Sequence, residues 1–259
     1  VWGSRLMFVV DSVAAGIGKK TLLRGVSFTV ERGTMTAIVG INGVGKSTLL
    51  RALGGIAKPH AGQVLIDAAN VHAIKPRHRA TLMTLVGQEE SPPGDLTVAE
   101  MVALGRLPYL KSWQLGSSKE KDIIARSLAT VGISDLADRP CDRLSGGQRR
   151  RALLARGFAQ ETDLVLLDEP TNHLDVHHQL HLLSVLKNSG RTIVATIHDL
   201  DLAMSYFDQV VVLHQGGMLC AGHPQTVLIP DNLRKVFDVQ ALIAQLPEAS
   251  SPHLIIDSL

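Results

Sequence analysis

Short apolar segments separated by turn residues characterise the first part of this chain. Apolar and alternating stretches over residues 5–39, with a turn at residues 16–18, predict β-strands that end in the apolar run at residues 35–39. A further short strand is predicted at residues 63–66 and a buried strand at residues 81–88. This part of the chain is therefore expected to be rich in β-structure.

Strands and helices alternate regularly in the C-terminal part. Short apolar strands are predicted at residues 164–167 and 192–196, and helices at residues 176–187 and from residue 200 onward. A hairpin is predicted over residues 210–220, around two consecutive glycines. Such alternation favours a mostly parallel sheet that is covered by helices on both faces.

A helical segment interrupts this α/β pattern. Thr97 and Glu100 have capping-box spacing at the start of a predicted helix, and residues 119–131 predict a second amphipathic helix. After residue 231 we expect a short helix followed by an irregular Pro- and Ser-rich segment. The predicted organisation is one α/β domain at residues 1–240, with an antiparallel N-terminal β subdomain and an α-helical insert at about residues 89–160, and a tail at residues 241–259.

Composition limits the classes of partner. The chain has 259 residues, 45% of them hydrophobic, which is enough to bury a sizeable core. Its 26 basic and 24 acidic residues give a net charge of +2, which offers no argument for a nucleic-acid partner. No apolar run reaches the ~18 residues needed to span a bilayer.

Glycines at fixed spacing follow the apolar run at residues 35–39 and precede a predicted helix. The spacing G-x-x-x-x-G-K-S lets the backbone turn tightly, so that successive N–H groups converge on a polyphosphate. Lys46 supplies a positive charge for the β- and γ-phosphates, and the Ser47 hydroxyl is placed to bind Mg²⁺. The helix that begins near Gly45 directs its positive end at the same anion. The predicted phosphate-binding residues are Gly40, Asn42, Gly43, Val44, Gly45, Lys46, Ser47 and Thr48.

Two acidic residues follow the predicted strand at residues 164–167. In a nucleotide site, Asp168 at the strand end would hold Mg²⁺, directly or through water. Glu169 would lie beside the γ-phosphate and polarise the attacking water as general base. An ordinary strand-to-turn exit explains the same pair in isolation, but the glycine loop upstream favours the catalytic interpretation.

Another predicted helix begins with an unusual first turn. Ser145 and Gln148 have capping-box spacing, and Gly146 and Gly147 between them leave the N–H groups of that turn open to an external anion. The chain thus has a second phosphate-facing helix N-terminus but only one glycine loop; a plain capped helix is the alternative interpretation. The arginines at residues 149–151 fit a solvated helix face and are not assigned to the nucleotide.

The segment LSGGQ at residues 144–148 resembles the signature of ATP-binding-cassette (ABC) ATPases. Gln88 matches the family glutamine that senses Mg²⁺ and the transmembrane partner. Asp175, in the loop after the catalytic acid, matches the residue that communicates across the dimer, and His198 matches the switch histidine that contacts the γ-phosphate. The resemblance covers roughly residues 5–240 and implies a P-loop NTPase-type α/β fold that hydrolyses ATP with Mg²⁺.

The resemblance also implies partners. In the family, two ATPase subunits form a head-to-tail dimer, and each ATP lies between the glycine loop of one subunit and the signature segment of the other. Two intact half-sites in one chain favour a homodimer. The helical insert of the family docks a transmembrane subunit near Gln88. We therefore expect a multi-span permease, a peripheral position at the cytoplasmic face of the cell membrane, and an indirect role for a substrate-binding protein.

The insert sequence suggests the class of cargo. Residues 97–109 closely resemble the importer subgroup that takes up iron–siderophores, haem and cobalamin, and residues 172–175 and 236–239 agree with it. We predict uptake of an iron–siderophore or haem, with cobalamin as the weaker alternative. An importer for a metal ion or an amino acid, and a soluble ATPase of the iron–sulfur assembly type, are alternatives with the same catalytic residues.

Two features of the sequence fit the family pattern less directly. The family usually places an aromatic residue against adenine, and the corresponding position here is Ile17. An aliphatic side chain covers the base without π-stacking, which predicts modest nucleotide affinity and weak base discrimination. His177, His178 and His181 follow Asp175 on a predicted helix, where a solvated face is favoured over a metal site.

Overall fold

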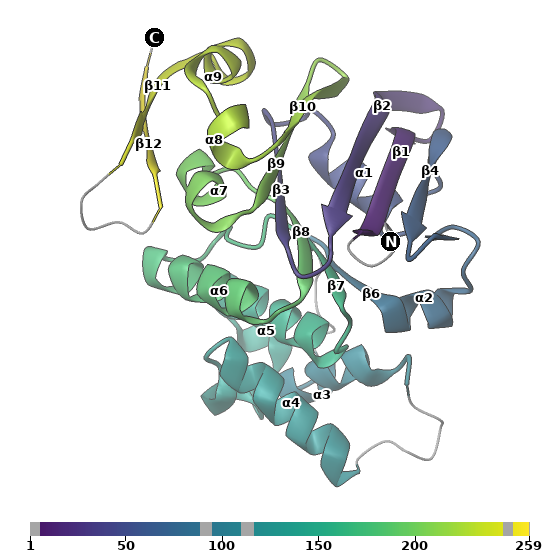
Figure 1. Ribbon diagram of the computed structural model, residues 1–259. Helices are drawn as coiled ribbons and strands as arrows, with labels where there is room; N and C mark the ends of the chain where they lie inside the picture. Colours follow the sequence, from purple (N-terminus) through teal and green to yellow (C-terminus); the bar gives the residue numbers. More distant parts are fainter. Residues whose placement is uncertain (1–5, 89–94, 110–116, 246–250, 259) are drawn as a thin grey trace.

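Six strands form the central sheet of the computed structural model, which describes residues 6–88, 95–109, 117–245 and 251–258 (Figure 1). Their order across the sheet is β10-β9-β3-β8-β7-β6. Every neighbouring pair is parallel except β9 and β10, which form an antiparallel hairpin. The strands are β3 (Met35–Val39), β6 (Met83–Val86), β7 (Leu164–Asp168), β8 (Thr192–Thr196), β9 (Gln209–His214) and β10 (Gly217–Gly222).

Burial on both faces explains why the inner strands are mostly apolar in sequence. Along β7, Leu164 and Leu166 pack into one hydrophobic cluster, and Val165 and Leu167 pack into another on the opposite face. Successive side chains of a strand point to opposite faces, so a sheet covered on both sides has apolar residues at most positions of each inner strand. The predicted mostly parallel sheet is thereby confirmed.

An antiparallel sheet forms the N-terminal part of the fold, with the order β2-β1-β4-β5. Helix α1 (Lys46–Leu53) contacts β1 of this sheet and strands β7 and β8 of the central one, so it links the two sheets. Its residues Leu49, Leu50 and Leu53 are fully buried in the shared core. The strands are β1 (Leu6–Ile17), β2 (Lys20–Glu31), β4 (Ala61–Ile66) and β5 (Ala69–Asn70).

Between β6 and β7 the described residues form a helical region, drawn at the bottom of Figure 1. The predicted capping box is present, because the Thr97 hydroxyl accepts from the Glu100 amide and the Glu100 carboxylate accepts from the Thr97 amide. Residues 89–94 at the start of the predicted insert lie outside the described residues. The helices are α3 (Val98–Ala103), α4 (Ser118–Thr130), α5 (Gly146–Ala159) and the 3₁₀ turns η1 (Leu104–Arg106), η2 (Ser134–Leu136) and η3 (Cys141–Arg143).

The strand predicted at residues 81–88 is shorter in the structure. Helix α2 (Pro76–Leu82) begins at a proline, whose fixed φ suits the first helical position, and it takes up Thr81 and Leu82. The chain becomes extended only at Met83, which leaves β6 as a strand of 4 residues. The prediction was wrong for residues 81–82, because a strand and a helix end look alike in a short apolar run, and residues 87–88 lie beyond the end of the strand.

Helices α6 (Val176–Asn188) and α7 (Leu200–Tyr206) follow β7 and β8, and α8 (Pro224–Val227) and α9 (Pro230–Phe237) follow the sheet. The C-terminal segment, expected to be irregular, forms an antiparallel hairpin of β11 (Val239–Ala244) and β12 (His253–Ser258). The Asp201 carboxylate on α7 accepts from the Leu254 amide at 2.8 Å, which ties the hairpin to the domain. The domain boundary at residue 240 stays a prediction, and this hairpin lies across it.

Candidate functional site

The carboxyl ends of β3, β6, β7 and β8 meet at one edge of the central sheet. Ligands of open α/β sheets bind at this edge. A cleft of about 750 Å³ lies there and is lined by residues of the glycine loop and by three other predicted site residues. Of the predicted residues, the cleft is lined by Asn42, Gly43, Gly45, Lys46, Ser47 and Thr48 from the glycine loop, together with Gln88, Glu169 and His198.

The glycine loop connects β3 to α1, as the sequence predicts. Gly45 precedes the helix with φ 111°, a backbone conformation that is unfavourable for residues with a side chain. It also packs against the Leu23 side chain. The Lys46 ammonium donates to the carbonyls of Gly40, at 2.8 Å, and Ile41, at 3.3 Å. Burial lowers the pKa of Lys46, while the Coulombic attraction of Glu169 and Asp168 opposes the shift.

Two oxygen-bearing side chains from different elements face each other beside the loop. The Ser47 hydroxyl at the start of α1 donates to the Asp168 carboxylate at the end of β7, at 3.1 Å. Thr196 on β8 donates to the same carboxylate oxygen at 2.7 Å, which fixes its orientation. Ser47, Asp168 and Gln88 line one cavity, which shares Ser47 and Gln88 with the glycine-loop cleft. Carboxylate, hydroxyl and amide oxygens are donors of the kind that Mg²⁺ prefers. These residues therefore fit a magnesium ion.

Glu169 lies directly after β7 with its side chain in the cleft. Its φ of 49° is in the left-handed region, which is uncommon for a residue with a side chain and often occurs at functional sites. The Glu169 amide donates to the Thr196 hydroxyl at 2.8 Å, which holds this backbone in place. Asn172 donates to one carboxylate oxygen and His198 contacts the other. The carboxylate is thus held by neighbours, and it is only 7% exposed.

The signature segment begins α5 with the predicted capping box. The Ser145 hydroxyl accepts from the Gln148 amide at 3.3 Å, and the Gln148 side-chain oxygen accepts from the Ser145 amide at 3.0 Å. Ser145 and Gly146 are exposed, and none of the residues 145–148 lines the glycine-loop cleft. Asp175 is also outside the cleft and caps α6, where the amide and imidazole of His178 lower the pKa of its carboxyl.

A family model described as ABC transporter matches residues 23–172, more than half of the chain. This chain belongs to the ABC transporter family. The match confirms the resemblance found in the sequence, and the chain is accordingly an ATPase. No helix among the described residues is long and apolar enough to cross a membrane.

Individual relatives and solved structures agree with the family assignment. The ferric enterobactin transport ATP-binding protein FepC of Escherichia coli is 34% identical, over 95% of this chain and 92% of its own length. The cobalamin import ATP-binding protein BtuD of Halobacterium salinarum is 39% identical, over 87% of this chain and 57% of its own length.

Two solved structures extend this similarity to the fold. An ABC transporter assigned to the metal-chelate type, in an inward-facing conformation, has a chain with 27% identity and a TM-score of 0.82, covering 97% of this chain and 98% of its own. The dimeric cassette MJ0796 bound to ADP and phosphate has 25% identity and a TM-score of 0.75, covering 84% and 99%. The ABC ATPase fold is therefore shown along nearly the whole chain.

Three residues of this ABC ATPase with evident contacts at the site were not singled out from the sequence. Thr196 bonds both acids, and Asn172 bonds Glu169; Asn172 lies in the segment 172–175 that agrees with the family, but neither residue was given a role of its own. Arg150 is 5% exposed and donates to the carbonyls of Gly87, at 2.6 Å, and Asp168. The expectation of a solvated face was wrong for Arg150, because α5 turns this residue toward the ends of β6 and β7.

Ile17 lies at the rim of the same ABC cleft, where the sequence places the base of a nucleotide. Its side chain is 69% exposed and lines the cleft beside Leu22. Two of the histidines on α6 contact oxygen atoms of neighbouring residues. The His178 imidazole contacts the Asp175 carboxylate at 2.8 Å, and the His181 imidazole contacts the Thr130 carbonyl at 3.2 Å.

Proposed function

We propose that this chain is the ATP-hydrolysing subunit of an importer for an iron chelate, a siderophore or haem, with cobalamin as the weaker alternative. The observation that carries the hydrolytic part is the placement of Glu169 and His198 in the same cleft as Lys46 and Ser47. The names of the relatives support the transport part, since the two reported above take part in ferric enterobactin transport and in cobalamin import.

In this proposal the cleft binds ATP with its triphosphate on the glycine loop. The loop amides and the positive end of α1 bind the phosphates, and Lys46 exchanges its carbonyl partners for phosphate oxygens. Ser47, Asp168 and Gln88 would hold Mg²⁺, which when bound neutralises charge on the β- and γ-phosphate oxygens. Glu169 accepts a proton from the attacking water, and His198 orients the γ-phosphate.

The second half of each site comes from another copy of the chain. Ser145–Gln148 and Asp175 lie outside the glycine-loop cleft of their own subunit, and the first turn of α5 is exposed. A head-to-tail homodimer would bring these residues to the γ-phosphate of the partner's ATP. Loss of the γ-phosphate on hydrolysis then weakens the interface and opens the dimer.

The helical insert supplies the surface for a membrane permease. Leu104, Leu107 and Tyr109 are 37%, 53% and 37% exposed, and they lie together on one turn after α3. Clustered exposed apolar side chains mark interaction sites. We assign this surface to a cytoplasmic segment of a multi-span permease, which would place the subunit at the cytoplasmic face of the membrane. A substrate-binding protein would act on it only through the permease.

Co-purification and stimulation test this function directly. We expect the tagged chain, expressed in its native host and solubilised in mild detergent, to bring a multi-span permease with it. In proteoliposomes, a binding protein loaded with an iron–siderophore or haem is expected to raise ATP hydrolysis severalfold, whereas the unloaded protein is not. If only a binding protein loaded with cobalamin, a free metal ion or an amino acid raised ATP hydrolysis, that compound would replace the iron chelate as the cargo. A chain recovered only in the soluble fraction, with assembly proteins or nothing attached, would contradict the importer.

Ile17 provides a separate prediction about the nucleotide. Replacing it with tyrosine adds a ring at the position of the base, and base–aromatic stacking is worth ~1–3 kcal/mol. We expect Ile17→Tyr to bind ATP about tenfold more tightly or better, as measured by titration of a fluorescent analogue and competition with ATP and GTP. Leu242→Tyr, at a 64% exposed aliphatic residue on β11, is the control. An unchanged affinity in Ile17→Tyr would show that Ile17 does not contact the base.

A further inference from the structure

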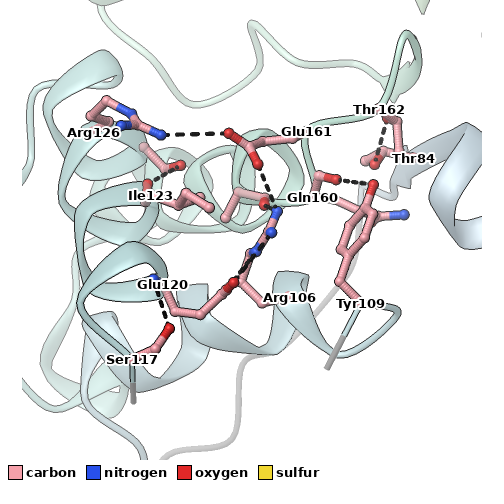
Figure 2. Close-up of polar contacts among 12 residues, drawn as sticks. Thr84, Arg106, Tyr109, Ser117, Glu120, Ile123, Arg126, Gln160, Glu161 and Thr162 are labelled. Carbon is pink, nitrogen blue, oxygen red and sulfur yellow. Dashed lines mark hydrogen bonds and ion pairs between the residues drawn. The ribbon is translucent and has the colours of Figure 1, made fainter. Parts of the chain in front are cut away.

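A buried arginine lies at the centre of the helical insert. Arg106 is 4% exposed, and its guanidinium donates to three acceptors from different elements (Figure 2). The Glu120 carboxylate on α4 accepts at 2.7 Å, the Ala159 carbonyl at the end of α5 at 2.7 Å, and the Glu161 carboxylate beyond it at 3.0 Å. The guanidinium also lies 4.5 Å from the ring centre of Tyr109. A buried charge with this many partners holds its surroundings in one arrangement.

Two further contacts attach the same turn to the end of α5. Gly105 packs so closely that a Cβ on it would lie 2.2 Å from the Arg156 carbonyl oxygen, so no side chain fits there. The Tyr109 hydroxyl donates to the Gln160 carbonyl at 2.7 Å (Figure 2). Residues 104–109, which we call the insert turn, therefore contact the last turn of α5 through backbone, charge and hydroxyl at once.

The other end of α5 carries the signature segment. The helix runs from Gly146 to Ala159, 14 residues, which corresponds to a length of about 20 Å. Rigid secondary-structure elements carry coupling between distant sites, so a displacement of one end of α5 reaches the other end. The Arg106 cation also lies at the negative, carbonyl end of this helix, which stabilises the contact.

A second connection runs from the end of α5 to the glutamine at the cleft. The Gln160 side chain donates to the carbonyls of Ala80 on α2 and Met83 at the start of β6. Strand β6 ends at Val86, two residues before Gln88. The insert turn is thus joined through one short segment to both the signature segment and Gln88.

The insert turn has two sides with different chemistry. Leu104, Leu107 and Tyr109 are exposed, and they form the surface assigned above to the permease. Arg106 points inward from the same turn and lies among its acceptors on α4 and α5 (Figure 2). A force applied to the outer side reaches α5 through the contacts of the inner side.

We propose that Arg106 is a positioning residue that makes the insert turn and α5 move as one body, so that movement of the permease displaces the signature segment and the reverse. This inference rests on the proposed permease partner. Arg106 does not line the nucleotide cleft and is itself buried beneath the outer surface, where it contacts the inner side of the Tyr109 ring, so its replacement should uncouple hydrolysis from transport without abolishing either binding event. Allosteric coupling of this kind is reciprocal and typically worth about 5–150-fold.

Arg106→Lys tests the inference, because lysine keeps the charge but cannot form the planar fork that serves three acceptors at once. The experiment uses the complete transporter in proteoliposomes with a cargo-loaded binding protein. We expect the ratio of cargo transported to ATP hydrolysed, and the stimulation by loaded binding protein, to fall by about tenfold. Basal hydrolysis by the isolated subunit and co-purification with the permease should stay within about twofold of wild type.

Arg126→Lys is the matched control, since Arg126 contacts the same Glu161 carboxylate at 3.5 Å but its side chain is 68% exposed. It should leave the coupling ratio unchanged. If Arg106→Lys does not fold, as judged by its melting temperature, Glu120→Gln removes the opposing charge at similar shape and is expected to lower the same ratio. The inference would be overturned if Arg106→Lys lost basal hydrolysis in the same proportion as transport. It would also be overturned if the folded variant kept the wild-type ratio of cargo transported to ATP hydrolysed. A wild-type chain that binds no permease contradicts the proposed function instead, before any variant is compared.

Discussion

Replacement of Glu169 by glutamine is expected to abolish ATP turnover while leaving ATP binding intact. Glutamine has the shape of glutamate and can still bond Asn172 and His198, but it cannot accept a proton from the attacking water. We expect steady-state hydrolysis by purified Glu169→Gln to fall by roughly 100-fold or more, the contribution typical of general-base catalysis. ATP would then persist between the subunits, and size-exclusion chromatography with Mg²⁺ and ATP should show a stable dimer.

The surroundings of Glu169 explain why a single atom replacement should have such a large effect. The carboxylate is 7% exposed, its backbone has a left-handed φ of 49°, and Thr196 fixes its amide. A residue held in an unfavourable backbone conformation by its neighbours has a defined side-chain position. No other acid lining the glycine-loop cleft offers a carboxylate for the same proton, within the described residues.

Asp163→Asn is the matched control for Glu169→Gln. It removes a charge just before β7, at the opposite end of the strand, and its side chain is 81% exposed. We expect hydrolysis by this variant to equal that of wild type. Near-normal hydrolysis by Glu169→Gln would show that Glu169 is not the general base. If the variant bound no ATP, the substitution would have damaged nucleotide binding in the cleft rather than activation of the attacking water.

The sequence was sufficient to predict the central sheet and the glycine loop because both depend on local chemistry. A strand covered on both faces is mostly apolar, as β7 is from Leu164 to Leu167, and the loop before α1 needs glycine where φ is 111° at Gly45. The capping boxes at Thr97 and Ser145 are similarly local, since each joins residues 3 apart. These features were therefore predicted at the correct residues.

Features that depend on distant partners were missed. Thr196 orients Asp168 from a neighbouring strand 28 residues away, and the Arg150 guanidinium reaches Gly87, 63 residues away. Nothing in the surrounding sequence marks either residue, because a lone Thr on a strand and an Arg among arginines are usually exposed or structural. The C-terminal hairpin was missed for the same reason, since Asp201 on α7 helps to hold β12.

The arrangement of the two phosphate-facing helix ends unites these observations. The N-terminus of α1 faces the cleft through Lys46 and Ser47, whereas Ser145 at the N-terminus of α5 is exposed and does not line the cleft. Both ends have the positive dipole that favours an anion. One copy of the chain therefore has both helix ends but does not bring them to one cleft, and the head-to-tail dimer proposed above would do so with a second copy.

Mixing two inactive variants is expected to restore ATP hydrolysis. Lys46→Ala removes the charge on the glycine loop, and Ser145→Arg places a cation at the positive end of α5; each alone should lower hydrolysis by about 100-fold. In a mixed dimer, the intact loop of the Ser145→Arg subunit meets the intact signature of the Lys46→Ala subunit. Random pairing puts half of the subunits in mixed dimers, each with one intact site of two, so about one quarter of wild-type activity should return.

The control places both substitutions in one chain. Mixed with either single variant, the double variant can form no intact composite site, so no activity should return, although each mixed dimer carries only one altered loop or signature more than the mixed dimer of the two single variants. Melting temperatures of the single variants separate misfolding from loss of the site. Activity restored in the first mixture and absent from the second requires that Lys46 and Ser145 act on one ATP from different subunits. Equal activities in the two mixtures would mean instead that each chain hydrolyses ATP with its own residues, and the head-to-tail dimer would have to be abandoned.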